Sequence, residues 1–202
     1  GLVRTAGTAL LNFNGGTLRA VPTTLGGAFM NLGTGTTLVN VRNGGAIVDS
    51  NGRDITIIDA LQHSTIGGDA AIDGGLTKLG NGILTLAGGS SYTGPTSING
   101  GSLVFSPGAA SYAATALTVS NATLSLDVSG GASTLTANSL TLQDNAAVVL
   151  NYGALSGNPT VAALNIAGSL TAPGTGLSIT INGVGFKPGN FTLIDYTGTA
   201  LP

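Results

Sequence analysis

The stretch from Gly75 to Phe105 constrains the fold more than any other part of the sequence, because it alternates very short apolar runs with tight turns. Glycines or an Asn-Gly pair close each of its four runs, Leu76–Leu79, Ile83–Leu86, Thr96–Ile98 and Ser102–Phe105. Asn and Gly tolerate the positive φ that sharp turns between strands require. The stretch therefore predicts strands joined by turns, and it has no grouping of residues typical of a catalytic centre.

The same kind of turn recurs along the chain. Six Asn-Gly pairs occur, at Asn14, Asn43, Asn51, Asn81, Asn99 and Asn182. Antiparallel hairpins would use the same signal, but strands of three to six residues are too short for a stable meander. Asn14–Val21, Asn43–Ser50 and Asn99–Ser106 also share one form, in which an Asn-Gly-Gly turn feeds an alternating strand. Such repetition is typical of stacked coils.

We therefore expect an all-β chain that forms a parallel β-helix, or β-solenoid. A coil of about 20 residues would give roughly ten short coils and a rod about 50 Å long at the spacing of neighbouring strands. Further strands are expected at 8–13, 17–21, 36–41, 46–49, 54–59, 116–119, 123–128, 139–142, 147–151, 162–166, 169–171, 177–181 and 191–195. Ala60–Ile72 is the least strand-like part, and a loop or short helical turn is expected there.

Composition supports this interpretation. Charged residues make up 7% of the chain, against about 25% in typical domains. Stacked strands place like charges close enough to repel, so an extended stack favours uncharged Thr, Ser and Asn. Six basic residues and a net charge of −2 do not form the footprint of a nucleic-acid binder. The long uncharged stretches are rich in Gly, Ser, Thr and Asn, so no membrane insertion is expected. Gly1 is not an initiator Met, and we expect a processed or excised piece.

The central stretch resembles a known family. LTKLGNGILTLAG at 76–88, YTG at 92–94 and TSINGGSL at 96–103 resemble the autotransporter passenger-associated strand repeat. Gly44–Leu61 and Phe191–Pro202 are similar to segments found before and after such repeats. The resemblance implies a right-handed parallel β-helix exported to the surface or exterior of a Gram-negative-type bacterium. In that family the repeat supports folding and display of a passenger, and it brings no catalytic residue. We expect one continuous solenoid over 1–202, with N-terminal coils and a polar loop at 1–74, the clearest repeat at 75–105 and C-terminal coils at 106–202.

One polar cluster could carry chemistry. It consists of Asp49, Arg53, Asp54, Asp59, His63, Asp69, Asp73 and Lys78. A polysaccharide lyase or hydrolase on a β-helix would use carboxylates with a Lys or Arg, but carboxylates at loops and strand ends are ordinary. The tandem Gly-rich pattern of a calcium-binding β-roll is missing, and the four tyrosines are too well separated to predict a sugar-stacking platform. No catalytic, cofactor or metal residue is therefore predicted.

Three classes of function remain. The first is an extracellular structural or adhesive solenoid, a surface stalk or scaffold without enzymatic activity. It could stack end to end into a filament and contact cell-surface or matrix components, because solenoid ends expose unpaired strand edges. The alternatives are a polysaccharide-degrading enzyme and a non-catalytic glycan- or protein-binding module.

Overall fold

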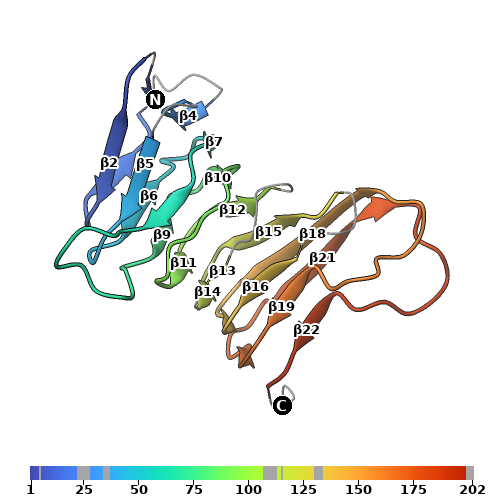
Figure 1. Cartoon of the computed structure of the whole chain (residues 1–202). Coiled ribbons are helices and arrows are strands. Elements are labelled where there is room, and N and C mark those ends of the chain that lie inside the picture. The colour runs from blue at the N-terminus through green and yellow to red at the C-terminus, as the bar shows by residue number, and fades with distance from the viewer. Residues whose placement is uncertain are drawn as a thin grey trace.

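A computed structural model describes residues 1–4, 6–21, 28–33, 37–106, 113–114, 116–129 and 134–198. These residues form strands and turns without a helix (Figure 1). Every strand pair among them is parallel. Within this part of the chain, nothing resembles a helix long and apolar enough to cross a bilayer.

Two faces of the molecule are long sheets of stacked strands. The eight-stranded sheet contains, in order, β1 (Leu2–Val3), β4 (Ala28–Asn31), β7 (Ile55–Ile57), β10 (Ile83–Leu86), β12 (Ser102–Phe105), β15 (Thr123–Asp127), β18 (Ala147–Ala154) and β21 (Ser178–Val184). The seven-stranded sheet contains β3 (Thr17–Arg19), β6 (Ala46–Asp49), β9 (Leu76–Leu79), β11 (Thr96–Ile98), β14 (Leu117–Val119), β17 (Leu140–Leu142) and β20 (Leu170–Thr171).

The third face is divided between the two halves of the stack. The three-stranded sheet contains β2 (Ala9–Phe13), β5 (Thr37–Val41) and β8 (Leu61–His63). The four-stranded sheet contains β13 (Ala113–Ala114), β16 (Leu135–Ala137), β19 (Leu164–Ile166) and β22 (Ile194–Tyr196). The chain visits the eight-stranded sheet, the third face and the seven-stranded sheet in turn, except between β10 and β11, where no third-face strand lies among the described residues. This order, with parallel pairing throughout, confirms the expected parallel β-solenoid. The right-handed sense implied by the family resemblance stays a prediction.

Coil length varies along the stack. Phe105 follows its strand partner Leu86 by 19 residues, close to the expected coil. In contrast, Leu86 follows Ile57 by 29 residues, and Ile181 follows Leu150 by 31. Longer coils use up more chain, so eight strands stack in the described part of the largest sheet instead of about ten coils. Seven spacings of about 4.8 Å give a stack about 34 Å long.

The core consists of columns of apolar side chains that run along the stack. One column in the eight-stranded sheet contains Leu2, Met30, Ile57, Leu86, Phe105, Leu126, Leu150 and Ile181, each in register with the next. The six inner members are buried, whereas the end members Leu2 and Ile181 are 38% and 41% exposed. Each fully buried side chain of this size stabilises the fold by about 1.5–3 kcal/mol. Stacking, more than any single strand, therefore holds the chain together.

The Asn-Gly-Gly turns differ from the expectation that all three mark one repeated unit. The turns at Asn14 and Asn43 do stack, because Gly44 N–H donates to the Asn14 side chain at 2.8 Å and Gly15 N–H donates to Gly45 at 2.9 Å. They lead into strands of the seven-stranded sheet. The turn at Asn99 leads into β12 of the eight-stranded sheet. The shared Asn-Gly-Gly sequence thus indicates the type of turn, but it does not indicate which sheet the following strand joins.

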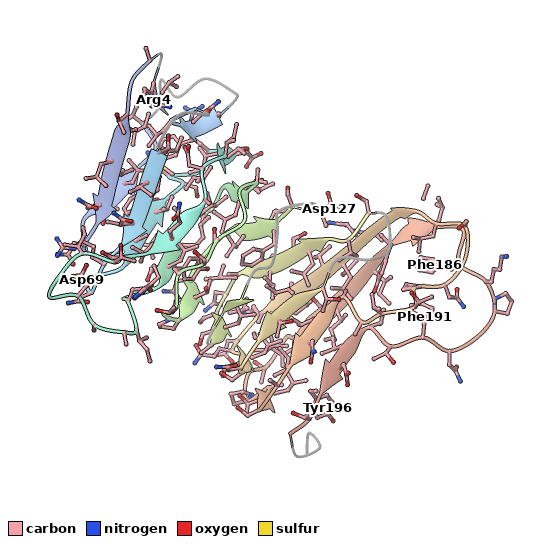
Figure 2. All side chains as sticks on the ribbon, viewed as in Figure 1. Arg4, Asp69, Asp127, Phe186, Phe191 and Tyr196 are labelled. Atoms are coloured by element: carbon pink, nitrogen blue, oxygen red, sulfur yellow. The ribbon has the colours of Figure 1, made fainter. Side chains whose placement is uncertain are left out.

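Two segment predictions need correction. The loop or helical turn expected at Ala60–Ile72 is wrong at its start, where β8 pairs with β5. The strand expected at 191–195 lies later, at Ile194–Tyr196. Phe191 instead stacks on Phe186 with ring centroids 5.5 Å apart, and both rings lie on the loop that follows β21 (Figure 2).

Candidate functional site

Two charged side chains, Lys78 and Asp73, are buried in and just before residues 76–105. β9 places Lys78 at an inward position, where it pairs with Val48 on one side and Ile98 on the other. Both neighbours are fully buried, and Lys78 itself is 0% exposed. A lysine therefore interrupts an apolar column of the core.

The ammonium of Lys78 reaches the turns at the corner of the solenoid. It donates to Gly80 O at 2.8 Å, Leu79 O at 2.9 Å and Ser50 Oγ at 3.0 Å, and Gly100 O lies 3.1 Å away. Three ammonium hydrogens are thus shared among four oxygens. Because these oxygens come from successive coils, Lys78 ties the corner turns of those coils together.

Burial lowers the pKa of Lys78 to about 8, and the nearby carboxylate of Asp49 partly opposes this shift. A buried amine with a lowered pKa is a feature of some active sites. Here the oxygens within hydrogen-bond distance lie at the end of β9 or in the neighbouring turns, so the contacts of Lys78 are structural.

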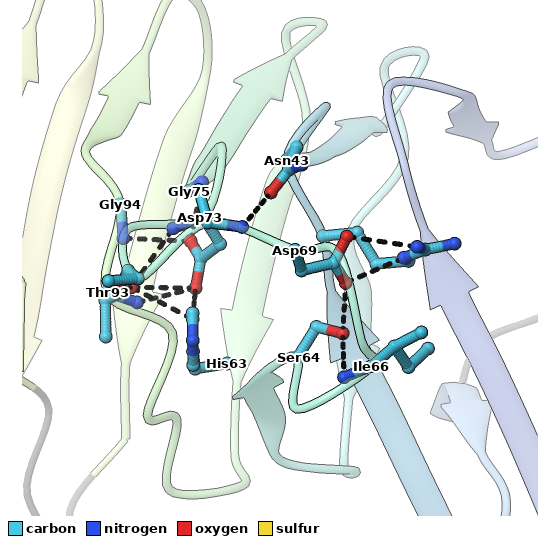
Figure 3. A network of polar contacts seen from close by, with 12 residues as sticks. Asn43, His63, Ser64, Ile66, Asp69, Asp73, Gly75, Thr93 and Gly94 are labelled. Atoms are coloured by element: carbon cyan, nitrogen blue, oxygen red, sulfur yellow. Dashed lines mark hydrogen bonds and ion pairs between the residues drawn. The ribbon is translucent and has the colours of Figure 1, made fainter.

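The carboxylate of Asp73, just before β9, is the centre of a network of hydrogen bonds (Figure 3). Its Oδ1 accepts the N–H groups of Gly75 at 2.9 Å and Gly94 at 2.8 Å. Its Oδ2 accepts the N–H of Thr93 at 2.8 Å and lies 2.9 Å from His63 Nδ1. The carboxylate thus joins its own turn to the Thr93–Gly94 turn of the next coil.

Burial by itself would raise the pKa of Asp73, but the Thr93 N–H, the His63 ring and the N–H groups of Gly75 and Gly94 outweigh it and hold this pKa below its ordinary value. Thr93, His63 and Asp73 resemble the Ser-His-Asp catalytic triad, with threonine in the place of serine. In that triad the two ring nitrogens of His contact different partners, whereas His63 Nδ1 contacts both Asp73 and the Thr93 hydroxyl, the latter at 3.0 Å. The geometry therefore supports an anchor and not a proton relay.

Asp69 forms a second anchor on the same loop. Arg42 donates to its two carboxylate oxygens at 2.8 and 3.0 Å, and the Ser64 hydroxyl donates to one of them. The Arg42 guanidinium and the Ser64 hydroxyl together hold the pKa of Asp69 below its usual range. This bidentate pair fixes the loop between β8 and β9 against the end of β5.

The remaining members of the predicted cluster lie apart from these anchors. Asp49 pairs with Arg19 at 2.9 Å, Asp54 accepts the N–H of Ile83 and Asp59 accepts the N–H of Leu32. The backbone N–H of Arg53 closes the turn at Ser50. The described residues include no group of three metal-ligating side chains. The residues of the predicted cluster thus do not converge on one point.

The sequence carries a signal for the role of Asp73. Asp73-Gly74-Gly75 occupies the same corner as Asn43-Gly44-Gly45, because Ala46 N–H donates to Gly75 O at 2.8 Å and Gly74 N–H donates to Arg42 O at 2.9 Å. Asp73 therefore takes the place of the turn asparagine. Accepting Asp as an equivalent of Asn in this turn would have marked its structural role.

We expect Asp73→Asn to lower the free energy of unfolding by about 2–3 kcal/mol, because an amide replaces a charged acceptor of several hydrogen bonds. Urea denaturation at pH 7 measures this change. Asp195→Asn is the control, because Asp195 is exposed, and its effect should stay within about 0.5 kcal/mol. Equal stability of the two variants would show that the Asp73 contacts contribute nothing specific.

The fold and these contacts define a class of protein, a parallel β-solenoid whose polar groups hold neighbouring coils together. Residues 76–105 match the family model of the passenger-associated-transport-repeat. The chain therefore carries this repeat of autotransporter passenger proteins, as the sequence resemblance predicted. The match begins with the first residue of β9 and ends with the last residue of β12. Comparison with curated proteins gave no match to the chain, and neither did comparison with solved structures.

Proposed function

We propose that the chain is a structural part of a passenger exported to the surface or exterior of a Gram-negative bacterium, where it acts as a stalk or scaffold without enzymatic activity. The passenger-associated-transport-repeat at 76–105 supports export. The observation that carries the structural role is the use of polar groups in and beside this repeat. Lys78 and Asp73 both join one coil to the next.

Surface display tests this role. The chain is placed between an epitope and a translocator barrel in a Gram-negative host, and the epitope is detected on intact cells. The intact chain should present the epitope, and a variant whose coils cannot stack, such as Gly75→Ala, should lose it. Gly52→Ala is the control. Equal display with all three chains would rule out a stacked solenoid as the displaying element.

A stalk of this kind can extend itself by end-to-end stacking, and we propose this for the purified chain. Leu2 and Ile181 terminate the same apolar column and are both partly exposed. A second copy that adds β1 beside β21 would continue the column and pair the backbone groups of the β21 edge.

We expect Ile181→Lys to shorten any filaments at least tenfold, because it places a charge where two columns would meet. Electron microscopy of concentrated protein measures the length distribution. Ile58→Lys is a matched control, because Ile58 is 44% exposed but lies beside the stack, after β7. Monodisperse short rods from the unmodified chain would contradict the stacking proposal and leave the scaffold role standing.

A further inference from the structure

A groove of about 440 Å³ crosses the last coils on the four-stranded sheet. Its lining residues are Thr134, Thr160, Val161, Ala162, Asn165, Thr192 and Asp195. They come from the segments that enter β16, β19 and β22 and from the outward positions of the last two strands. The groove therefore offers side chains from successive rungs in one line along the solenoid.

Asn165 and Asp195 lie on neighbouring rungs and are in register. Leu164 and Ile166, the two residues that flank Asn165, are buried. Strand alternation therefore turns the Asn165 side chain outward. Within the part of the chain that the structure describes, no hydrogen bond or ion pair engages the side chain of either Asn165 or Asp195. The amide and the carboxylate are thus both available to a ligand.

A second Asp–Asn pair on neighbouring rungs shows that this availability is specific. Asp127 and Asn151 are in register in the eight-stranded sheet. Asp127 accepts the N–H of Ser129 at 3.1 Å, while Asn151 donates to Ser125 and accepts from Asn182. The same two residue types are therefore satisfied internally at one place and left open in the groove.

The chemistry of the groove selects one class of ligand. Asp195 can accept two hydroxyl hydrogens, Asn165 can donate and accept, and Thr160 and Thr192 add hydroxyls. Among the described residues that line the groove, Asp195 alone carries a charge, and that negative charge disfavours acidic glycans. A single carboxylate is a poor calcium site, because calcium takes six to eight oxygen ligands. None of the described residues that line the groove is aromatic, so recognition by them would rest on hydrogen bonds.

We propose that this groove binds a neutral, hydroxyl-rich glycan, with Asp195 and Asn165 as the paired residues that read its hydroxyl groups. Such binding would give the stalk the adhesive role that the sequence suggested. The site does not depend on the scaffold function, because its side chains lie outside the core columns.

A glycan array probed with the full chain tests the proposal, with neutral and acidic oligosaccharides on the same slide. We expect binding to neutral glycans that is unchanged by EDTA. For the best neutral oligosaccharide, titration calorimetry should show at least a tenfold loss of affinity in Asp195→Ala and in Asn165→Ala. Thr160→Arg, an exposed change at the rim, should block the groove without touching the core.

Asp127→Ala is the matched control and should bind the oligosaccharide as the unmodified chain does. Circular dichroism of each variant separates lost binding from lost folding. The proposal is overturned if the array shows no neutral glycan, if only acidic glycans bind, or if the folded Asp195, Asn165 and Thr160 variants all bind normally. Each of these results leaves the display experiment, and hence the scaffold function, unaffected.

Discussion

Gly75→Ala is expected to prevent stable folding of the chain. A Cβ at this position would lie 1.8 Å from Pro95 O and 2.7 Å from Pro95 N, far inside van der Waals contact. The obstacle is backbone of the next coil, which cannot withdraw without breaking the Leu76 N–H to Pro95 O bond of 2.9 Å. We expect a loss above about 4 kcal/mol, a large part of the stability of a typical domain.

Gly52→Ala separates this clash from backbone strain. Gly52 has φ +75° and Gly75 has φ +69°, so alanine strains both positions similarly. No atom lies within 4 Å of the position that a Cβ would take at Gly52. We expect Gly52→Ala to lower the free energy of unfolding by only about 1–2 kcal/mol. Far-ultraviolet circular dichroism and urea denaturation of both variants measure the difference, and similar values for the two would refute close stacking at Gly75.

The requirement at Gly75 explains why the fold could be predicted from this sequence. Parallel coils bring backbone against backbone at corners such as those of Gly44, Gly74 and Gly75, where a Cβ would meet backbone atoms closer than 3 Å and glycine is therefore required. Residues such as Asn43 and Gly44 therefore recur beside strands whose alternation is visible without a structure. Two of the short strands, β13 and β16, escaped prediction because they offer two or three residues and too little alternation to detect. The two-residue β20 was within the strand expected at 169–171.

The candidate site was only partly predictable. Lys78 and Asp73 were both in the predicted polar cluster. Their closeness in the sequence does not reveal that Lys78 enters the core whereas Asp73 joins two turns. Strand alternation places Lys78 on the face of Leu76 but opposite the leucine that follows it, so the pattern of β9 left the direction of Lys78 open. Asn165 and Asp195 could not be paired, because their separation of 30 residues reflects a long coil, whereas the estimated coil length was about 20.

Lys78→Met is expected to be more harmful at alkaline pH than at neutral pH. The methionine side chain fills a volume similar to that of lysine. It leaves the carbonyls of Gly80 and Gly100 without the hydrogen-bond donor that lysine provides. An unsatisfied buried acceptor costs about 1–3 kcal/mol, while removal of a buried charge returns part of that cost. At pH 7.5 we therefore expect the variant to be less stable by about 1–2 kcal/mol.

The pH dependence follows from the lowered pKa of Lys78, about 8 in the folded chain against about 10.4 in the unfolded chain. Above pH 8 the unfolded chain binds more protons at this residue than the folded chain does. Unfolding therefore becomes less favourable as pH rises, by about 2 kcal/mol between pH 8 and 9.5. Methionine does not titrate, so the deficit of Lys78→Met should grow to about 3–4 kcal/mol at pH 9.5.

Urea denaturation at several pH values from 7.5 to 9.5 measures this growing deficit. The range stops there because burial raises the pKa of Tyr152 above its usual value, and its ionisation in the unfolded chain would lower stability above about pH 10. Lys187→Met is the control, because Lys187 is exposed and its replacement should change the free energy of unfolding by no more than about 0.5 kcal/mol. A deficit for Lys78→Met that shrinks with rising pH would mean that Asp49 holds Lys78 as a stabilising ion pair, and that the carbonyl contacts matter little.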